Sequence, residues 1–163
     1  MYQTVLESLE ALSPWMSWAH GGYQMQEARD FIAACQHGWE QDTFYGYSIY
    51  SCQDGVYLGG VSLNHIDRSF RLCNLAYWVR TSHRGQGIAA RASRLAARFA
   101  FEQLELVRVE IVVTVDNQAS LQVATKTGAK KEGVLRNRLI VRETYQDAVM
   151  HSLIPQDFGM EMR

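Results

Sequence analysis

The sequence predicts a single α/β domain over residues 1–163, built on a mixed, mostly antiparallel sheet that is flanked by helices. Amphipathic helical segments alternate with β-branched and aromatic runs, which is the first sign of this class. Three strand-like runs then follow one another before the second helix, as in antiparallel hairpins and unlike a repeated strand-helix-strand unit. Finally, a content of 47% hydrophobic residues in 163 residues is enough for one sizeable core.

The elements can be placed in order along the chain. Apolar residues recur at helical spacing over Met25–Glu40, which predicts an amphipathic helix. Gln53-Asp54-Gly55 is a hairpin turn signal between the first two strands, and Gly128 is expected to end the third helix. In the second helix, Leu95 and Phe99 are expected on the apolar face together with Ile88, Ala92 and Ala96. The elements predicted after Glu40 are strands 43–52, 56–66 and 71–79, helix 87–103, strand 107–115, helix 117–127, and strands 132–141 and 147–153.

Composition excludes several classes of function. A net charge of −1 argues against a protein that binds mainly a nucleic-acid backbone or an anionic membrane surface. Cys35, Cys52 and Cys73 lack the close spacing of zinc ligands and are predicted to be reduced, buried thiols. Neither a signal peptide nor an apolar run of about 18 residues is found, so a cytoplasmic location is expected.

A basic, glycine-containing loop joins an aromatic strand to an alanine-rich helix over residues 77–90. Backbone N–H groups can approach a ligand closely at Gly85, Gly87 and Ala89, and the helix points its positive end at the same place. This junction predicts a phosphate site. A Rossmann fingerprint is disfavoured because Ala90 stands at its third position and three strands precede the loop, and the P-loop spacing is absent. The loop by itself is also compatible with an ordinary turn.

The order of motifs resolves this ambiguity. Arg84-x-x-Gly87-x-Ala89 is followed about thirty residues later by a second motif, residues 115–120 (VDNQAS), and the pair resembles the acetyl-coenzyme A signature of the GNAT N-acetyltransferase superfamily. Residues 12–19 (LSPWMSWA), 76–79 (AYWV), 132–136 (EGVLR) and 145–147 (YQD) are similar to the RimJ/RimL branch, which acetylates protein amino termini, including those of ribosomal proteins.

This resemblance implies a GNAT fold in which two strands splay apart to form the acetyl-CoA cleft. It implies acetyl-CoA as co-substrate and no metal. The pyrophosphate is expected on the loop N–H groups, the pantetheine arm beside the strand that ends at Val79, and Asn117 on the other side of the arm. A backbone N–H near Val79 is expected to polarise the thioester carbonyl. The implied cofactor-binding residues are Tyr77, Trp78, Val79, Arg84, Gly85, Gln86, Gly87, Ile88, Ala89 and Asn117.

The same resemblance implies direct attack of a neutral amine on the thioester. Many GNAT enzymes place a tyrosine where this chain has Ala124, whereas the RimL-like branch uses a serine, which corresponds to Ser120. Ser120 is therefore the implied catalytic residue, a hydrogen-bond donor to the departing sulfur; its alternative is an ordinary serine in a first helical turn. The branch glutamate that acts as base corresponds to Leu139. Other candidates for the base are Glu143, Asp147 and His151.

The implied acceptor is the α-amine of a protein N-terminus. Two alternatives stay open: a small-molecule amine such as a polyamine or antibiotic, and a non-catalytic acyl-CoA binding protein. The first strand of relatives is expected to be short or missing here, which leaves the sheet edge and a homodimer interface open. Trp15, Met16 and Trp18 are expected either in the core or as a cap on the acceptor groove.

Overall fold

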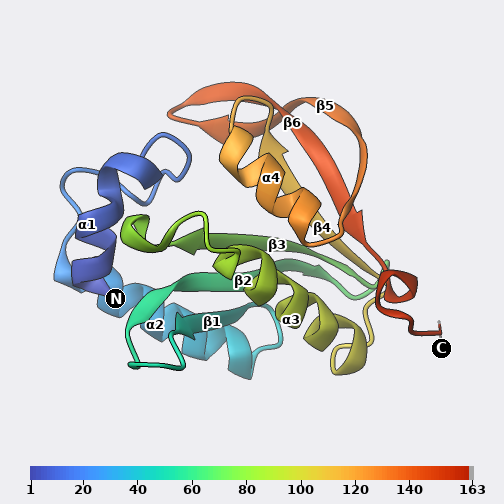
Figure 1. The fold of residues 1–163 in the computed structure, drawn as a ribbon. Helices are drawn as coiled ribbons and strands as arrows, with labels where there is room; N and C mark the ends of the chain where they lie inside the picture. The colour runs from blue at the N-terminus through green and yellow to red at the C-terminus, as the bar shows by residue number, and fades with distance from the viewer. Residues whose placement is uncertain (162–163) are drawn as a thin grey trace.

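A six-stranded sheet forms the centre of the structure, a computed structural model that describes residues 1–161 (Figure 1). The strand order is β1-β2-β3-β4-β6-β5, and only the β3–β4 pair is parallel. The predicted mixed, mostly antiparallel sheet is therefore confirmed. The elements are α1 (Tyr2–Leu12), α2 (Met25–Glu40), β1 (Tyr45–Tyr50), β2 (Tyr57–Asp67), β3 (Leu72–Val79), the 3-10 turn η1 (Thr81–His83), α3 (Ile88–Glu102), β4 (Arg108–Thr114), α4 (Gln118–Lys126), β5 (Lys130–Val141), β6 (Thr144–Leu153) and the 3-10 turn η2 (Pro155–Phe158).

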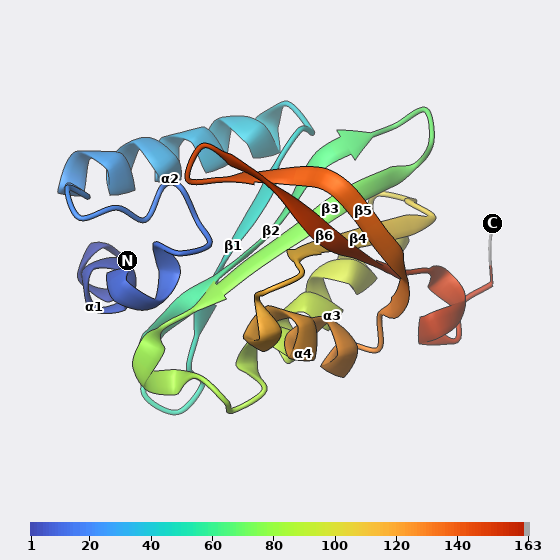
Figure 2. The same ribbon diagram turned by 90° about the horizontal axis from the view of Figure 1, so that it is seen from above.

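The helices cover both faces of this sheet. Seen from above, α3 and α4 lie on one face and α2 on the other, with α1 beside the end of β3 (Figure 2). Helix α1 was not among the predicted elements. Within residues 1–44 the structure contains no strand, so the first strand expected to be short or missing is absent from the described chain before β1.

The main core lies between the sheet and α3. Alternate residues of β4 point into it, and Val109 and Ile111 are almost fully buried. In α3 the buried positions are mainly alanines, including Ala97 and Ala100, which allow the helix to approach the strands closely. Leu95, expected on the buried face, is 70% exposed, so that part of the prediction is wrong. The alanine positions, not the larger residues, define the packed face.

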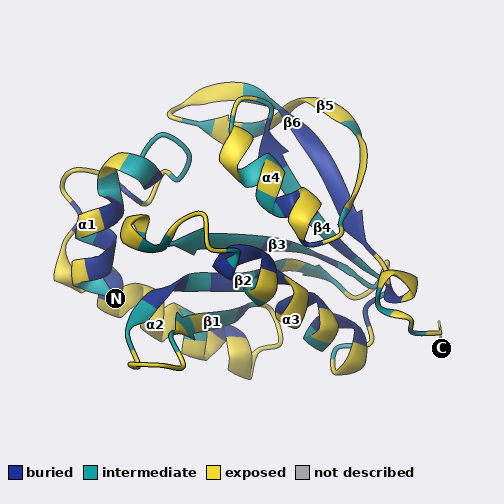
Figure 3. Cartoon of the chain, in the orientation of Figure 1, coloured by how far each residue is buried: buried dark blue, intermediate teal, exposed yellow. Residues whose placement is uncertain are grey.

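Strand β5 is the outer edge of the sheet, and its burial differs from that of its neighbour. Residues of β5 are mostly exposed, whereas the second half of β6 is buried between β5 and β4 (Figure 3). The three cysteines are free thiols. Cys73 is buried and Cys35 half-buried, but Cys52 is exposed because it begins the turn between β1 and β2, so the prediction of a buried thiol is wrong there.

Candidate functional site

The site begins where β3 and β4 separate. These parallel strands pair only at one end, where residues from Leu72 to Asn74 face residues from Arg108 to Glu110. Both strands then continue without pairing, β3 as far as Val79 and β4 as far as Thr114. Backbone polar groups on this edge of β3 are therefore free of ladder hydrogen bonds and can pair with an extended ligand. The expected splayed strand pair is present.

The loop between η1 and α3 lies at the open end of this gap. Gly85 and Gly87 have φ angles of 77° and 74°, which is left-handed backbone that favours glycine. Gly87 is the N-cap of α3 and provides no side-chain cap, so the first N–H groups of the helix have no partner within it. A Cβ at Gly85 would meet nothing within 4 Å, so the space beside this residue is open. These features fit a bound phosphate group.

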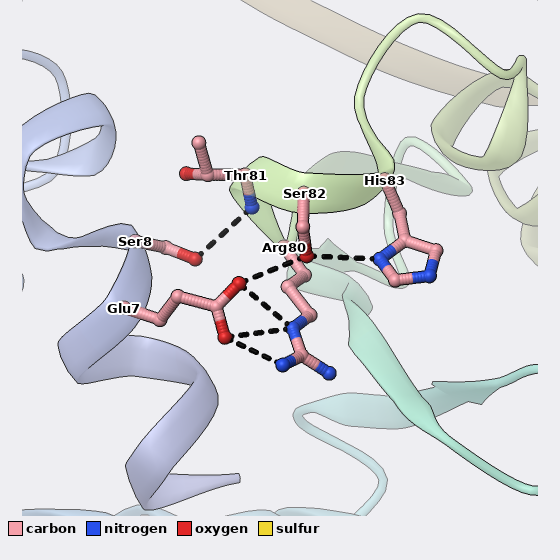
Figure 4. Close-up of polar contacts among 6 residues, drawn as sticks. All are labelled: Glu7, Ser8, Arg80, Thr81, Ser82 and His83. Carbon is pink, nitrogen blue, oxygen red and sulfur yellow. Dashed lines mark hydrogen bonds and ion pairs between the residues drawn. The ribbon is translucent and has the colours of Figure 1, made fainter.

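A polar network fixes the segment before this loop to α1 (Figure 4). The Glu7 carboxylate accepts hydrogen bonds from Arg80 Nε at 2.9 Å and from Ser82 Oγ at 2.8 Å. Ser8 Oγ accepts the backbone N–H of Thr81 at 3.1 Å, and Ser82 Oγ lies 3.0 Å from His83 Nδ1. Hydrogen bonds from Arg80 and then Ser82 lower the pKa of Glu7. Helix α1 therefore sets the start of the glycine loop.

Helix α4 forms the other wall of the gap. Asn117 is its N-cap, and its Oδ1 accepts the backbone N–H of Ser120 at 3.1 Å. The hydroxyl of Tyr77 on β3 lies 2.9 Å from Ser120 Oγ and 3.0 Å from the Ser120 carbonyl oxygen. Burial raises the pKa of Tyr77 to about 12, although the hydrogen bond with Ser120 opposes this, so the phenol stays protonated at neutral pH.

These elements enclose a cavity of about 210 Å³. Every implied site residue lines it except Gln86, whose carbonyl oxygen instead accepts a hydrogen bond from Arg91 Nη1 at 3.0 Å. The Arg91 side chain thereby stabilises the loop. The implied residues that line the cavity are Tyr77, Trp78, Val79, Arg84, Gly85, Gly87, Ile88, Ala89, Asn117 and Ser120.

Several lining residues were not predicted from the sequence. Ala119, Gln122 and Lys126 share one face of α4 at helical spacing, a signal that could have found them. Lys126 adds a positive charge that favours phosphate. Trp15 and Met16, from the segment after α1, also line the cavity, while Trp18 packs at 5.9 Å from the ring of Trp78.

The structure places the candidate bases away from this cavity. Glu143 lies exposed in the β5–β6 turn with a φ of 60°. Asp147 accepts the backbone N–H of Asn137 at 2.8 Å, which is a structural role. His151 is buried in β6, where desolvation lowers its pKa. Leu139 lies on β5 and offers no base. None of these four residues lines the cavity.

Among residues 1–161, no group of three or more His, Cys, Asp or Glu side chains could hold a metal ion. No helix in that range is long and apolar enough to cross a membrane.

Comparisons with known proteins agree with this geometry. Residues 3–130 match the family model of the acetyltransferase (GNAT) domain. The chain is 28% identical over 161 residues to the Bacillus subtilis (strain 168) protein "Putative ribosomal N-acetyltransferase YdaF", which covers 98% of this chain and 86% of that protein. It is 27% identical over 108 residues to the spermidine N(1)-acetyltransferase of Escherichia coli (strain K12), covering 66% of this chain and 58% of that protein.

Among solved structures, the chain resembles RimL, a ribosomal L7/L12 α-N-protein acetyltransferase in complex with coenzyme A. The TM-score is 0.84 at 25% identity, and the match covers 94% of this chain and 85% of that chain. The matched family model, the splayed strands and the glycine loop at the start of α3 lead to the same conclusion. The chain belongs to the GNAT family and is an acetyl-CoA-dependent N-acetyltransferase.

Proposed function

We propose that this enzyme acetylates the α-amino group of a protein N-terminus. The observation on which this proposal depends concerns the cavity beside the glycine loop, which we call the cofactor cavity: within residues 1–161 its lining contains no Asp or Glu, and His83 is the one histidine in it. The acceptor must then supply its own neutral amine or lose its proton to water or to the His83 imidazole. Similarity over nearly the full length to a protein named as a ribosomal N-acetyltransferase supports the same acceptor class.

The pKa of the acceptor decides which amines can react without a nearby base. An α-amine has a pKa of about 8, whereas an alkylamine has a pKa of about 10.4. At pH 7.5 the neutral fraction of the α-amine is therefore roughly 200 times larger. A polyamine or a lysine side chain is almost fully protonated at this pH and would depend on a base, for which the cofactor cavity offers only the His83 imidazole, so the α-amine is the better substrate.

The cofactor-binding residues are proposed as the sequence motif implies. The loop from Arg84 to Ala89, with the open space beside Gly85 and the uncapped start of α3, would hold the pyrophosphate. The unpaired edge of β3 near Val79 would hold the pantetheine arm and polarise the carbonyl oxygen of the thioester. Asn117, whose side-chain oxygen caps α4, would contribute its amide N–H₂ from the opposite wall.

Acetyl-CoA supplies an activated acetyl group, and the protein must stabilise the departing thiolate sulfur. A carbon–nitrogen bond forms and the carbon–sulfur bond breaks, while the nitrogen loses one proton and the sulfur gains one, so the products are an N-acetyl amide and the thiol of coenzyme A. Ser120 Oγ would donate a hydrogen bond to the sulfur, and the Tyr77 hydroxyl, which donates to the Ser120 carbonyl oxygen at 3.0 Å, would share its proton with Ser120 Oγ. Tyr77 on β3 thus provides the site with a phenol. The position on α4 at which many GNAT enzymes carry a tyrosine is occupied by Ala124, which has no hydroxyl.

A coenzyme A release assay tests the proposal. Peptides that begin with Ser, Ala or Met are compared with spermidine and aminoglycosides, which serve as the alternative small-molecule acceptors. We expect kcat/KM to be higher for the peptides and to rise with pH until about pH 8, where the α-amine becomes mostly neutral. Turnover of spermidine with no turnover of peptides would overturn the N-terminal assignment. Acetyl-CoA binding by calorimetry with no turnover of any amine would contradict an enzymatic role.

A further inference from the structure

A second and larger cavity lies between α2 and strands β1, β2 and β3, on the face of the sheet opposite α3 (Figure 2). We call it the α2 cavity. Its volume is about 910 Å³. Packed protein interiors contain few voids larger than a water molecule, whereas ligand sites have volumes of about 300–1,000 Å³. The α2 cavity therefore has the size of a binding site.

The floor of the α2 cavity consists of small and polar residues, bordered by the aromatic rings of Tyr57 and Trp78. On the other face of the same strands, Leu63 and Leu75 are large, buried and packed under α3. The strands thus support a dense core on one side and leave space on the other. The floor residues are Gly46, Ser48, Gly60, Ser62, Asn64 and Ala76.

Helix α2 forms the roof of the α2 cavity and contributes apolar as well as polar side chains to it. Phe31 and Ile32 line the cavity from α2 and remain 46% and 47% exposed. The helix is fixed at both ends: Ala28 is buried against α1, and Trp39 Nε1 donates to the carbonyl oxygen of Gly46 at 3.2 Å. Between these two points Phe31 packs edge-on against Phe44, with ring centroids 6.3 Å apart, and part of the apolar surface of α2 stays uncovered.

The α2 cavity also reaches the reaction site. Met16, Tyr77 and Trp78 line both it and the cofactor cavity. Among its lining residues in the described chain, the only charged side chains are the carboxylates of Glu27 and Glu40. Glu27 already lies 2.9 Å from His20 Nε2 and accepts the backbone N–H of Gln24 at 2.7 Å, whereas within residues 1–161 no hydrogen bond is found for the Glu40 carboxylate. A ligand that joins an apolar group to a positively charged amine therefore matches this lining in polarity and in sign of charge.

We propose that the α2 cavity binds a bulky apolar or aromatic side chain at the first or second residue of the acceptor peptide. This assignment rests on the proposed function, because the α-amine of that peptide must reach the sulfur beside Ser120 and Tyr77. The side chain would fill the space under Phe31 and Ile32 and bury their exposed surface. The enzyme would then select N-termini by the apolar bulk next to the reacting amine.

Kinetic comparison of matched peptides tests this selectivity. Pentapeptides that carry Phe or Leu at one of the first two positions are compared with otherwise identical peptides carrying Gly. At saturating acetyl-CoA, we expect kcat/KM to be about 10-fold or more higher for the Phe and Leu peptides. The KM for acetyl-CoA should not depend on the peptide. Equal kcat/KM values for Phe and Gly peptides would overturn the proposal.

Substitutions that fill the floor provide the second test. Ser62→Leu and Ala76→Leu are expected to lower kcat/KM for Phe peptides by about 10-fold and to change that for Gly peptides far less. Ala76→Val is a milder variant in case a leucine prevents folding, which thermal unfolding reveals. Ser69→Leu, the same change in the exposed β2–β3 turn, should leave both values unchanged. A preference for Phe that survives in every folded floor variant would contradict the assignment.

Binding without turnover separates this proposal from the proposed function. Calorimetry with coenzyme A in place of acetyl-CoA measures the Kd of each peptide when no acetyl group is available. Tighter binding of Phe than of Gly peptides by a protein that acetylates neither would support the cavity and overturn the function. Tighter binding of phenethylamine than of any peptide would overturn the peptide source. Equal Kd values for the Phe peptide, the Gly peptide and phenethylamine would overturn the cavity assignment.

Discussion

Tyr77 and Ser120 come from β3 and α4, and their hydroxyl oxygens lie 2.9 Å apart. Tyr77→Phe removes one hydroxyl and keeps the ring, so we expect kcat to fall roughly 10–100-fold while the Kd of acetyl-CoA is unchanged. Ser120→Ala should have an effect of similar size. Because the two hydroxyls are proposed to act as one unit, the double variant should be no slower than the worse single variant. Steady-state kinetics and calorimetry measure both quantities.

A matched control for these variants is Tyr145→Phe, since Tyr145 on β6 is 65% exposed and lines neither cavity. Its kcat should equal that of the wild type. If the losses of Tyr77→Phe and Ser120→Ala are instead fully additive in the double variant, the two hydroxyls act separately and the proposed relay is wrong.

Two tyrosines on β1 should respond in opposite directions to loss of the hydroxyl. The Tyr47 hydroxyl is buried without a hydrogen-bond partner, whereas the Tyr45 hydroxyl donates to Asp42 Oδ1 at 2.6 Å and accepts from Arg68 Nη2 at 3.2 Å. Tyr47→Phe is therefore expected to raise the free energy of unfolding by up to about 1 kcal/mol, and Tyr45→Phe to lower it by about 1 kcal/mol. Urea unfolding measures both. A loss of stability in Tyr47→Phe would reveal a partner for that hydroxyl.

At the scale of elements, the contact between α1 and the glycine loop connects two segments far apart in sequence. Glu7→Gln keeps the size of the side chain but removes the charge that holds Arg80 and Ser82. We expect the Kd of acetyl-CoA to rise roughly 3–10-fold, because the loop loses a charge-assisted support, while kcat at saturation changes little. Glu10→Gln, an exposed position on the same helix, is the control. An unchanged Kd in Glu7→Gln would show that the loop holds its conformation without α1.

The elements also show why sequence patterns predict some parts of the fold and not others. Helix α2 begins and ends at the predicted residues, because its apolar residues recur regularly. Helix α1 was missed because two of its buried positions, Thr4 and Ser8, are polar and interrupt the apolar period. In α3, Leu95 was wrongly predicted to lie on the buried face. Most of the buried positions of this helix are alanines, which add little to an apolar periodicity dominated by larger residues.

Sequence patterns likewise predict one part of the candidate site and not the other. The glycine loop is local in sequence, so the spacing around Gly87 was enough to predict its place at the start of α3. The contact between Tyr77 and Ser120 joins residues 43 positions apart and depends on how β3 and α4 are packed. The α2 cavity depends on the separation of a helix from a sheet, which no local pattern encodes. Both features depend on how distant segments pack together, which the sequence patterns do not contain.

At the scale of the whole molecule, the sheet separates the two cavities that we propose for the donor and the acceptor. Helices α3 and α4 form the side that holds the cofactor cavity, and α2 covers the side that holds the larger cavity (Figures 1 and 2). Tyr77 and Trp78 on β3 line both cavities. Under the two proposals, acetyl-CoA and the acceptor would enter from opposite sides of the sheet and meet beside β3.

The other half of the sheet should determine stability in acid. Glu132 on β5 accepts hydrogen bonds from Arg108 Nη1 on β4 at 2.8 Å and from Ser152 Oγ on β6 at 2.6 Å, so it ties three strands together. Arg108, and then Ser152, lower the pKa of Glu132 from 4.5 to about 2. Because the folded pKa lies below the unfolded one, this stabilisation is present above pH 4.5 and is lost as the pH falls toward 2.

The variant Glu132→Gln tests this pH dependence. We expect it to lower the free energy of unfolding at pH 7 by about 1 kcal/mol, a value reduced for the partial exposure of the pair. The difference from wild type should shrink below pH 4.5 and vanish near pH 2, as wild-type Glu132 becomes protonated. Glu102→Gln, which removes only an exposed ion pair with Arg98, should match the wild type at every pH. Urea unfolding measures each case, and a Glu132→Gln deficit that stays constant from pH 7 to pH 3 would mean that this carboxylate does not govern acid stability.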